Sequence, residues 1–391
     1  MTNPKILIVD DEPFNIDYLE QELEETNYEL IAAVNGQETL EKVQSESPDL
    51  ILLDIMMPVM DGFEVLSHLK ANKATRDIPV IVISASSDLQ SMVKGIKLGA
   101  EDYLPKPFEP TLLHARISSS LEKKRLRDLQ QLYLKGLERE LEIGREIQAG
   151  FLPEELPRVE GWEIAASLMS AREVAGDFYD TFDLPDGNIG LVIADVCDKG
   201  VGAALFMTLF RSLIRITANQ ECFEHTENVS ASPSVAERLR RAMILTNNYI
   251  AETHGGSGMF ATLFFGILDP RDGRLTYING GHEPPLIIQS GKVRQTLHKT
   301  GPAVGVITNC RFEILETQLH EGDIFFAFTD GVPDCKDPRG EFFGRERVYD
   351  IFQRASTSSS ELVKVFETEL RQYISTAIQF DDITLLVVRR V

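Results

Sequence analysis

Residues 121–152 read LEKKRLRDLQQLYLKGLERELEIGREIQAGFL, and this stretch divides the chain into two parts with different patterns. It contains no proline and is rich in Leu, Glu, Lys, Arg and Gln, which are strong helix formers. Its apolar side chains recur at spacings of three and four, at Leu126, Leu129, Tyr133, Leu137 and Leu141. This stripe predicts an amphipathic helix that packs either on a neighbouring element or on its own copy in a homodimer. The homodimer is the favoured interpretation.

Length and composition limit the possible classes. A chain of 391 residues is too long for one ordinary core, so two domains and a connector are expected. The net charge of −22 argues against a nucleic-acid partner, because DNA and RNA phosphates require a basic surface. We expect no membrane-spanning run, no signal peptide and, from four scattered cysteines, no disulfide or thiolate zinc site. These features predict a cytoplasmic protein that does not bind membranes.

In residues 1–120, short apolar runs alternate with helical patterns, and each run ends near a polar residue. KILIV precedes Asp10 and Asp11, DLILL precedes Asp54, IPVIVI precedes Ser84, and DYL is followed closely by Lys106. Such alternation predicts a parallel sheet covered by helices on both faces. Because ligands bind at the carboxyl ends of the strands in such sheets, these polar residues should lie together.

The chemistry of these polar residues is that of phosphoryl transfer. Three carboxylates brought together repel one another and need a cation, and ligation by oxygen with water suits Mg²⁺. Asp54 could then act as the nucleophile on phosphorus and form an aspartyl phosphate. Lys106 would neutralise the phosphoryl oxygens, and Ser84 would donate a hydrogen bond to one of them. The simpler interpretation, that each residue only caps a strand, suits any one of them but not the set.

The first 120 residues resemble the receiver domain of a two-component response regulator, through VDDEP, LLDIMMPVMDG, VISA and GAEDYLPKP. The resemblance implies a flavodoxin-like (βα)5 fold, phosphorylation of Asp54 by a sensor histidine kinase, and Ser84 and Tyr103 as the pair that reports it. It also implies a cis Lys106–Pro107 bond. The implied Mg²⁺ ligands are Asp10, Asp11, Asp54 and the carbonyl oxygen of Met56.

Residues 153–391 show grouped strand-like runs with helices between them, which predicts stacked antiparallel sheets flanked by helices. The turn sequences PDGN at 185–188 and RDGR at 271–274 predict hairpins. Residues 221–233, 254–258 and 331–344 are interpreted as loops that could contact a protein partner. Strands are expected at 162–169, 188–196, 260–269, 274–279, 323–328 and 383–390, and helices at 203–217, 235–253 and 359–376.

Aspartates stand at the ends of these runs: Asp177, Asp195, Asp330, and the pair Asp381 and Asp382. A carboxylate at the rim of a sheet has a rigid support. Four that converge could hold two divalent cations and activate a bridging water for attack on a phosphate ester. A lone Asp-Gly is better interpreted as a turn, but the whole set favours a metal site.

From about Gly144 to the C-terminus, the chain resembles the metal-dependent serine/threonine phosphatases (PPM) of the bacterial stage II sporulation protein E branch. The resemblance rests on EIGREIQAGFLP, REVAGDFYD, DVCDKGVGAAL, TYINGGHEPPL, FTDGVPD and FDDITLLVV. It implies an α-β-β-α sandwich with two Mn²⁺ or Mg²⁺ ions, between which Asp195 forms a bridge. The implied ligands are Asp177, Asp195, the carbonyl oxygen of Val196, Asp330 and Asp381.

Some positions depart from the common pattern of this branch. Ala175 stands where Gly is usual, and Cys197-Asp198 stands where Ser-Gly is usual, so the extra carboxylate leaves the metal stoichiometry open. His282 is assigned no catalytic role. Arg172 is either a contact for substrate phosphate or an exposed arginine without a role.

The full prediction is a receiver (1–120), a helical linker (121–152) and a phosphatase domain (153–391). Phosphorylation of Asp54 would control hydrolysis of a phosphoserine or phosphothreonine protein, for which the resemblance implies an anti-sigma factor antagonist. The alternatives are a phosphatase fold that sequesters a partner with little turnover, and a metal-dependent nuclease or pyrophosphatase. A transcription factor is disfavoured because the chain lacks a basic recognition helix. The residues expected to carry the chemistry are Asp54, Lys106, Ser84, Asp195 and Asp330.

Overall fold

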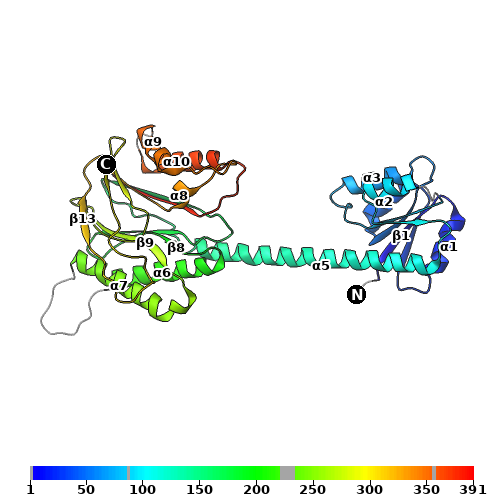
Figure 1. The fold of residues 1–391 in the computed structure, drawn as a ribbon, viewed down its shortest axis with the longest axis horizontal. Coiled ribbons are helices and arrows are strands. Elements are labelled where there is room, and N and C mark those ends of the chain that lie inside the picture. The colour runs from blue at the N-terminus through cyan, green and yellow to red at the C-terminus, as the bar shows by residue number, and fades with distance from the viewer. Residues whose placement is uncertain (1–2, 86–88, 221–233, 355–357) are drawn as a thin grey trace. The chain divides into compact units, whose positions relative to one another are not determined.

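A computed structural model describes residues 3–85, 89–220, 234–354 and 358–391 of the chain. The chain forms two compact units, Met1–Glu138 and Arg139–Val391, which are described separately below (Figure 1). The predicted loop at 221–233 lies outside the described residues.

The first unit contains a five-stranded parallel sheet in the order β2-β1-β3-β4-β5. Helices α1 and α5 cover one face, and α2, α3 and α4 cover the other (Figure 1). The predicted receiver architecture is therefore confirmed. Its elements are β1 (Lys5–Val9), α1 (Pro13–Leu23), β2 (Glu29–Ala33), α2 (Gly36–Glu46), β3 (Leu50–Asp54), α3 (Gly62–Ala71), β4 (Val80–Ser84), α4 (Leu89–Lys97), β5 (Asp102–Pro105) and α5 (Pro110–Ala149).

The strand β1 shows why the strand sequences of this sheet are apolar at almost every position. Leu7 and Val9 pack in the layer of α2 and α3, while Ile6 and Ile8 pack in the layer of α1 and α5. Successive side chains of a strand point to opposite faces, and helices cover both faces here. Each strand therefore needs apolar residues at every position, which explains KILIV, LILL and VIVI.

Helix α5 begins inside the first unit and continues without a break to Ala149. Leu113 and Ile117, near its start, are fully buried in the core of that unit. Residues 121–149 of the predicted linker helix continue the last receiver helix, so the linker is not a separate helix. The boundary between the two compact units falls within this helix, after Glu138.

The second unit contains two five-stranded antiparallel sheets, in the orders β13-β10-β9-β8-β7 and β12-β11-β14-β15-β6. Helices α6 and α7 cover the first sheet, and α8, α9 and α10 lie on the second (Figure 1). The strands are β6 (Trp162–Met169), β7 (Phe178–Asp183), β8 (Ile189–Val196), β9 (Ala261–Asp269), β10 (Arg274–Gly280), β11 (Leu286–Gln289), β12 (Lys292–Thr296), β13 (Leu315–Gln318), β14 (Ile324–Phe328) and β15 (Ile383–Arg390). The helices are α6 (Val201–Asn219), α7 (Val235–Thr253), the 3₁₀ turn η1 (Gly255–Ser257), α8 (Gly331–Asp334), α9 (Gly344–Arg354) and α10 (Ser359–Ile374).

Three apolar layers hold the second unit together. Val192 and Val196 of β8 pack beneath α6 and α7, whereas Leu191 and Ile193 of the same strand face the other sheet. On the second sheet, Phe326 and Phe328 pack beneath α9 and α10. Layers of helix, sheet, sheet and helix form the predicted α-β-β-α sandwich, which is confirmed.

The hairpin predictions were correct, and the missed strands are short or at sheet edges. Gly187 and Gly273 adopt positive φ angles of 79° and 86° in the predicted turns, a conformation that glycine takes without strain. The strands β7, β11, β12 and β13 were not predicted; β7, β12 and β13 lie at sheet edges, and the interior strand β11 has only four residues. Edge strands need apolar residues less, as the mostly exposed β12 (KVRQT) illustrates. The predicted loops at 254–258 and 331–344 contain η1 and α8.

Helix α6 corrects one expectation about membranes. By length and composition, it is the one helix of the described chain that could cross a bilayer, whereas the sequence analysis anticipated none. However, Met207 and Phe210 on one side of it are fully buried in the core against the first sheet. Arg211 and Arg215 form ion pairs with the buried Asp180, at 3.2 and 2.8 Å. A core helix passes the same test, so the finding is weak support for a membrane span.

Candidate functional site

In the first unit, the acidic residues meet a lysine at the carboxyl edge of the sheet. Asp10 follows β1 and Asp54 ends β3, and their exposed fractions are only 2% and 6%. Lys106 follows β5, and its Nζ donates to Oδ2 of Asp10 at 2.6 Å and to Oδ1 of Asp54 at 2.7 Å. The structure therefore brings these three predicted site residues together.

The carboxylate of Asp54 is oriented from both sides. Its Oδ1 accepts from Lys106, and its Oδ2 accepts from the backbone N–H of Met56 at 2.7 Å. Burial raises the pKa of Asp54, and the Lys106 ammonium opposes that rise. The neighbouring Asp10 accepts from the side chain of Asn15 at 2.9 Å. The Asp54 carboxylate, the proposed nucleophile, is therefore held in one orientation with the Lys106 ammonium beside it.

The other predicted receiver residues lie along the same edge. Ser84 ends β4 and is buried, and Tyr103 lies buried in β5. Asp11 follows Asp10 and is half-buried. The Lys106–Pro107 bond is cis, as predicted. The roles of these residues remain predictions.

In the second unit, acidic residues from separate strands converge. Asp177 directly precedes β7, Asp195 lies near the end of β8, Asp330 follows β14, and Asp381 precedes β15. Burial, followed by the charges of Asp330 and Asp381, raises the pKa of Asp195 to about 7. Burial, followed by the charges of Asp195 and Asp382, raises the pKa of Asp177 well above its ordinary value. Carboxylates that influence one another in this way form one electrostatic site.

Hydrogen bonds hold Asp177 in place. Its Oδ2 accepts from the hydroxyl of Thr384 at 2.8 Å. The backbone N–H of Thr384 donates in turn to the hydroxyl of Thr329 at 3.0 Å, which ties β15 to the end of β14. Neither threonine was predicted as a site residue, because a threonine in or next to a strand gives no sign of a functional partner.

Asp382 supports the backbone around Asp177. It accepts backbone N–H groups of Ala171 at 2.7 Å, Gly176 at 2.7 Å and Asp177 at 3.4 Å. Asp381 and Asp382 are adjacent in the chain but have different partners, since Asp381 pairs with the side chain of Lys199 and Asp382 accepts from backbone N–H groups. The sequence alone did not indicate which of the two would support the fold.

Asp381 is paired with a cation from the protein itself. Lys199 Nζ lies 2.9 Å from Asp381 Oδ2, donates to the Phe380 carbonyl, and stands 3.8 Å from the centre of the Phe380 ring. The ammonium group therefore neutralises one of the predicted metal ligands. The sequence analysis did not identify Lys199.

The unusual Cys197-Asp198 sequence fits the turn after β8. Asp198 has φ of +71°, a left-handed conformation in which Gly is least strained and Asp is better tolerated than most other residues. Its Oδ1 accepts from the N–H of Lys199 at 2.8 Å. The Cys197 sulfur accepts from the N–H of Phe260 at 3.1 Å. The substitution is thus accommodated by local hydrogen bonds.

Two glycines in the acidic motifs are required by close packing. A Cβ on Gly62 would overlap the carbonyl oxygen of Asp54, and a Cβ on Gly331 would overlap the carbonyl oxygen of Asp382. Each glycine lets a helix start directly against the end of a strand that carries site residues. The Asp-Gly pairs in these motifs therefore reflect close packing rather than a turn with positive φ.

The metal ligands remain predictions. Within residues 3–85, 89–220, 234–354 and 358–391, no three His, Cys, Asp or Glu side chains are arranged to hold a metal ion. The chemistry of the donor set nevertheless fits a hard divalent cation, because Asp177, Asp195, Asp330 and Asp381 offer oxygen atoms, and burial and neighbouring carboxylates raise the pKa values of the first three. Divalent cations would relieve that repulsion.

His282 and Arg172 also have defined places. His282 is 1% exposed; its Nδ1 lies 2.9 Å from the Thr262 hydroxyl, and its Nε2 has no hydrogen-bond partner in the described chain. Thr262 pairs with Asp195 in the β8–β9 register, so His282 supports the strand beside the acids. Burial lowers the pKa of His282 to about 3. Arg172 is exposed near Gly200.

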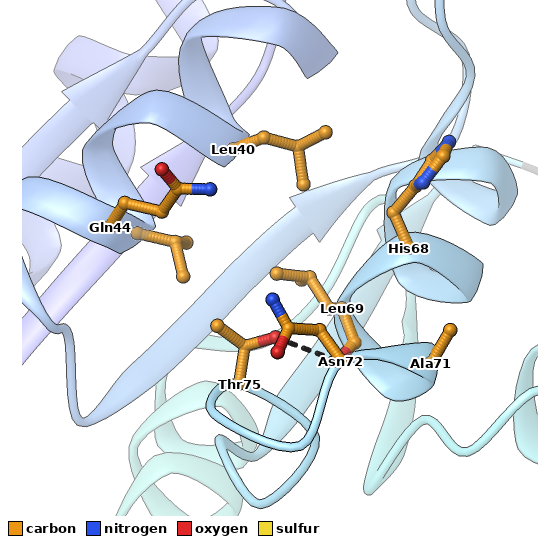
Figure 2. A pocket seen from close by; sticks show the side chains of 8 residues that line it. Leu40, Gln44, His68, Leu69, Ala71, Asn72 and Thr75 are labelled. Atoms are coloured by element: carbon orange, nitrogen blue, oxygen red, sulfur yellow. Dashed lines mark hydrogen bonds between the residues drawn. The ribbon is translucent and has the colours of Figure 1, made fainter.

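A pocket of about 330 Å³ in the first unit lies away from the acids (Figure 2). Leu40 and Gln44 line it from α2, and His68 and Asn72 line it from α3 and the following residue. The hydroxyl of Thr75, also in its wall, donates to the carbonyl of Leu69 at 2.8 Å. This pocket lies near the residues that lead into the start of β4, whereas Asp10 and Asp54 stand at the opposite ends of the strands. It is not part of the candidate site.

Two known families match the sequence. Residues 185–391, more than half of the chain, match the family described as stage II sporulation protein E (SpoIIE), and residues 6–118 match the response regulator receiver domain. The matched regions contain Asp195, Asp330 and Asp381 of the second unit and Asp10, Asp54 and Lys106 of the first.

Individual proteins match parts of the chain. Protein IcfG of Synechocystis sp. (strain ATCC 27184 / PCC 6803 / Kazusa) is 44% identical over 264 residues, which cover 64% of this chain and 41% of that protein. The alkaline phosphatase synthesis transcriptional regulatory protein PhoP of Bacillus subtilis (strain 168) is 40% identical over 121 residues, 31% of this chain and 50% of that protein. The chain thus spans half or less of the length of these relatives.

A solved structure supports the fold of the second unit. The SiaA-PP2C domain of Pseudomonas aeruginosa aligns with a TM-score of 0.53 and 22% identity, over 66% of this chain and 98% of that domain. At this level of identity, the similarity concerns the fold alone.

Proposed function

The chain belongs to the stage II sporulation protein E (SpoIIE) family and carries a response regulator receiver domain, and from this we propose a receiver-controlled, metal-dependent protein serine/threonine phosphatase. The observation that carries the proposal is the convergence of Asp177, Asp195, Asp330 and Asp381, which come from separate strands. PPM phosphatases and receiver domains generally use Mg²⁺ or Mn²⁺. The proposed cofactors are two such ions in the phosphatase unit and Mg²⁺ in the receiver.

In the phosphatase reaction, the chain supplies oriented carboxylates. Asp195 is proposed to lie between the two cations, with Asp177, Asp330, Asp381 and the Val196 carbonyl completing the ligand set. The cations, when bound, supply Lewis acidity and an activated water for hydrolysis of the phosphate ester. Thr384 holds the direction of Asp177, so that its carboxylate does not have to reorganise during the reaction.

In the receiver, Asp54 is proposed to accept the phosphoryl group from a sensor histidine kinase. The Asp54 carboxylate attacks phosphorus, and the bond from phosphorus to the donor nitrogen breaks. Lys106, already 2.7 Å from Asp54, would then neutralise the phosphoryl oxygens. Asp10, Asp11, Asp54 and the Met56 carbonyl are proposed to hold Mg²⁺, with Ser84 and Tyr103 reporting the modification.

The helix α5 is proposed to pair with its own copy in a homodimer. Leu126, Leu129, Tyr133 and Leu137 lie at spacings of three and four, and they are 58, 52, 68 and 39% exposed. A stripe of exposed apolar residues along a helix is the pattern of a coiled-coil seam. Leu141, the fifth member of the predicted stripe, is half-buried within the second unit.

The proposed substrate is a protein phosphorylated on serine or threonine, specifically an anti-sigma factor antagonist in the cytoplasm. The chief alternative is a phosphatase fold that sequesters such a partner with little turnover. The test offers phosphorylated antagonist, a phosphotyrosine peptide and a nucleotide at equal concentration with Mn²⁺ or Mg²⁺. We expect hydrolysis of the first that stops with a chelator and falls by orders of magnitude in Asp195→Ala. Equal efficiency on all three would contradict the protein substrate, and binding without turnover would favour the alternative.

Receiver control has a separate test. Phosphatase rates are compared with and without an acyl-phosphate mimic on Asp54, in the parent and in Asp54→Asn. The proposal predicts a rate change in the parent that is absent in the variant. The same rate in the parent with and without the mimic would contradict control by the receiver.

A further inference from the structure

Gln148 is buried at the end of a helix that is otherwise exposed. In Arg139–Ala149, the part of α5 within the second unit, Leu141 and Gly144 are half-buried and Gln148 is 8% exposed, while the other residues are exposed. Positions 141, 144 and 148 share one face of a helix. This face contacts the rest of the unit, and it carries an amide where an apolar residue would be ordinary.

The amide of Gln148 binds the backbone of a single residue. Its Nε2 donates to the carbonyl oxygen of Ala175 at 2.6 Å, and its Oε1 accepts from the N–H of Ala175 at 2.9 Å. One turn earlier, Gly144 lies against Val174. Ala175 is fully buried, so water has no access to replace the amide if Gln148 is removed.

The segment 170–177 connects β6 to β7 without helix or strand, and Asp177 stands at its end. In the described chain, side chains of two residues hold its backbone N–H groups. Gln148 holds Ala175, and Asp382 holds Ala171, Gly176 and Asp177. Since Ala175 is only two residues from Asp177, loss of the Gln148 pair would release the segment on one side.

The same segment contacts a second predicted ligand. Gly176, directly after Ala175, packs so closely on the Val196 carbonyl that a Cβ there would lie 3.1 Å from its oxygen. A displacement at Ala175 therefore changes the surroundings of Asp177 and of the Val196 carbonyl together. The Asp177 carboxylate and the Val196 carbonyl oxygen both belong to the set of metal ligands proposed above.

We propose that Gln148 is a positioning residue, which fixes the Asp177 carboxylate and the Val196 carbonyl for divalent cations by clamping Ala175. This inference rests on the proposed phosphatase function. It makes the last turn of α5 a part of the metal-binding structure rather than a spacer. Because α5 is one continuous helix from Pro110 to Ala149, Gln148 would couple a change in this helix to the segment that carries Asp177.

The experiment measures Mn²⁺ binding to the full chain directly, from the electron paramagnetic resonance signal of free Mn²⁺. Gln148→Met keeps the length of the side chain and removes both hydrogen bonds. Gln148→Glu keeps an acceptor for the Ala175 N–H but loses the donor to its carbonyl. Gln130→Met, at an exposed position on the same helix, is the matched control. The receiver is the same in every variant and should bind the same amount of Mn²⁺. A difference in Mn²⁺ binding between variants therefore comes from the phosphatase unit.

We expect Gln148→Met to weaken Mn²⁺ binding by about tenfold, Gln148→Glu to lie between it and the parent, and Gln130→Met to match the parent. Fluorescence emission from Trp162, the single tryptophan, establishes whether each variant is folded. If Gln148→Met does not fold, the Mn²⁺ affinity of Gln148→Glu tests the inference instead. Unchanged Mn²⁺ affinity in a folded Gln148 variant would overturn this inference and leave the phosphatase intact. A parent that neither binds Mn²⁺ nor hydrolyses phosphoprotein would instead remove the proposed function.

Discussion

Protonation of His282 should make the stability of the phosphatase unit depend on pH. His282 is fully buried, and its folded-state pKa is lowered from 6.5 to about 3. The folded unit therefore keeps the imidazole neutral at pH values where the unfolded chain protonates it. The contribution of His282 to stability is fully present above its unfolded pKa, and it is lost progressively as the pH falls from about 6.5 toward 3.

The size of the effect follows from the two pKa values. Between about pH 8 and about pH 5, the unfolded chain gains nearly one proton at this residue and the folded chain gains almost none, which lowers the free energy of unfolding by about 2 kcal/mol. Asp177 and Asp195 act in the opposite direction, because their raised pKa values let the folded state bind protons first. The contribution of His282 must therefore be isolated by comparison with a variant.

The assay is urea unfolding in the presence of a chelator, followed by the emission of Trp162. This single tryptophan is buried in β6, so its signal reports the second unit and not the receiver. The stability difference between the parent and His282→Gln should change by about 2 kcal/mol between about pH 8 and about pH 5, in the direction that disfavours the parent at low pH. The variant His320→Gln, at an exposed histidine of the same unit, is measured alongside as the control for removing a histidine. A difference for His282→Gln that stays constant between these pH values would refute the buried neutral imidazole.

Three further predictions concern Asp54, α5 and Lys199. Asp54→Asn should abolish labelling by a phosphodonor with no change in the folded receiver, and full labelling would assign the phosphoacceptor elsewhere. Leu137→Asp should shift sedimentation from dimer to monomer and remove phosphorylation-dependent control while basal turnover survives, because it places a charge in the seam; a parent that sediments as a regulated monomer would contradict it. Lys199→Ala should lower the Mn²⁺ concentration for half-maximal activity by up to about fivefold, since a partly exposed ion pair is worth at most about 1 kcal/mol. Lys199→Arg should match the parent, and a higher Mn²⁺ requirement in Lys199→Ala would show that the ammonium does not compete with metal.

The fold of the receiver could be predicted because its pattern is local. The runs that form β1, β3 and β4 are apolar throughout, and each is followed closely by a helical period, so the parallel sheet and the edge that carries the candidate site follow from the sequence. Asp54, Asp10 and Lys106 could be identified because the carboxyl ends of parallel strands meet at one edge. The continuity of α5 was missed, although no proline interrupts residues 111–149, because the resemblance to a receiver domain ended at residue 120.

The second unit was less predictable at its edges and in its supporting contacts. Strands β7, β12 and β13 were missed because edge strands carry mixed side chains, and β11 was missed because its apolar run is only four residues long. The supporting roles of Asp382, Lys199 and Gln148 were also missed. Their partners lie 206, 181 and 27 residues away in the chain, so no periodicity or spacing connects them.

The two domain classes, the hairpin turns and the candidate acidic residues could all be predicted from the sequence alone. Apolar periodicity and turn chemistry act over a few residues, and the acids are marked by their positions at the ends of strands. The partners of the side chains around the acids depend on the tertiary structure: Asp382 supports the backbone, Asp381 pairs with Lys199, and the amide of Gln148 clamps the segment that carries Asp177. The physical reason is that burial and hydrogen-bond partners depend on which distant segments the packed sheets and helices bring into contact.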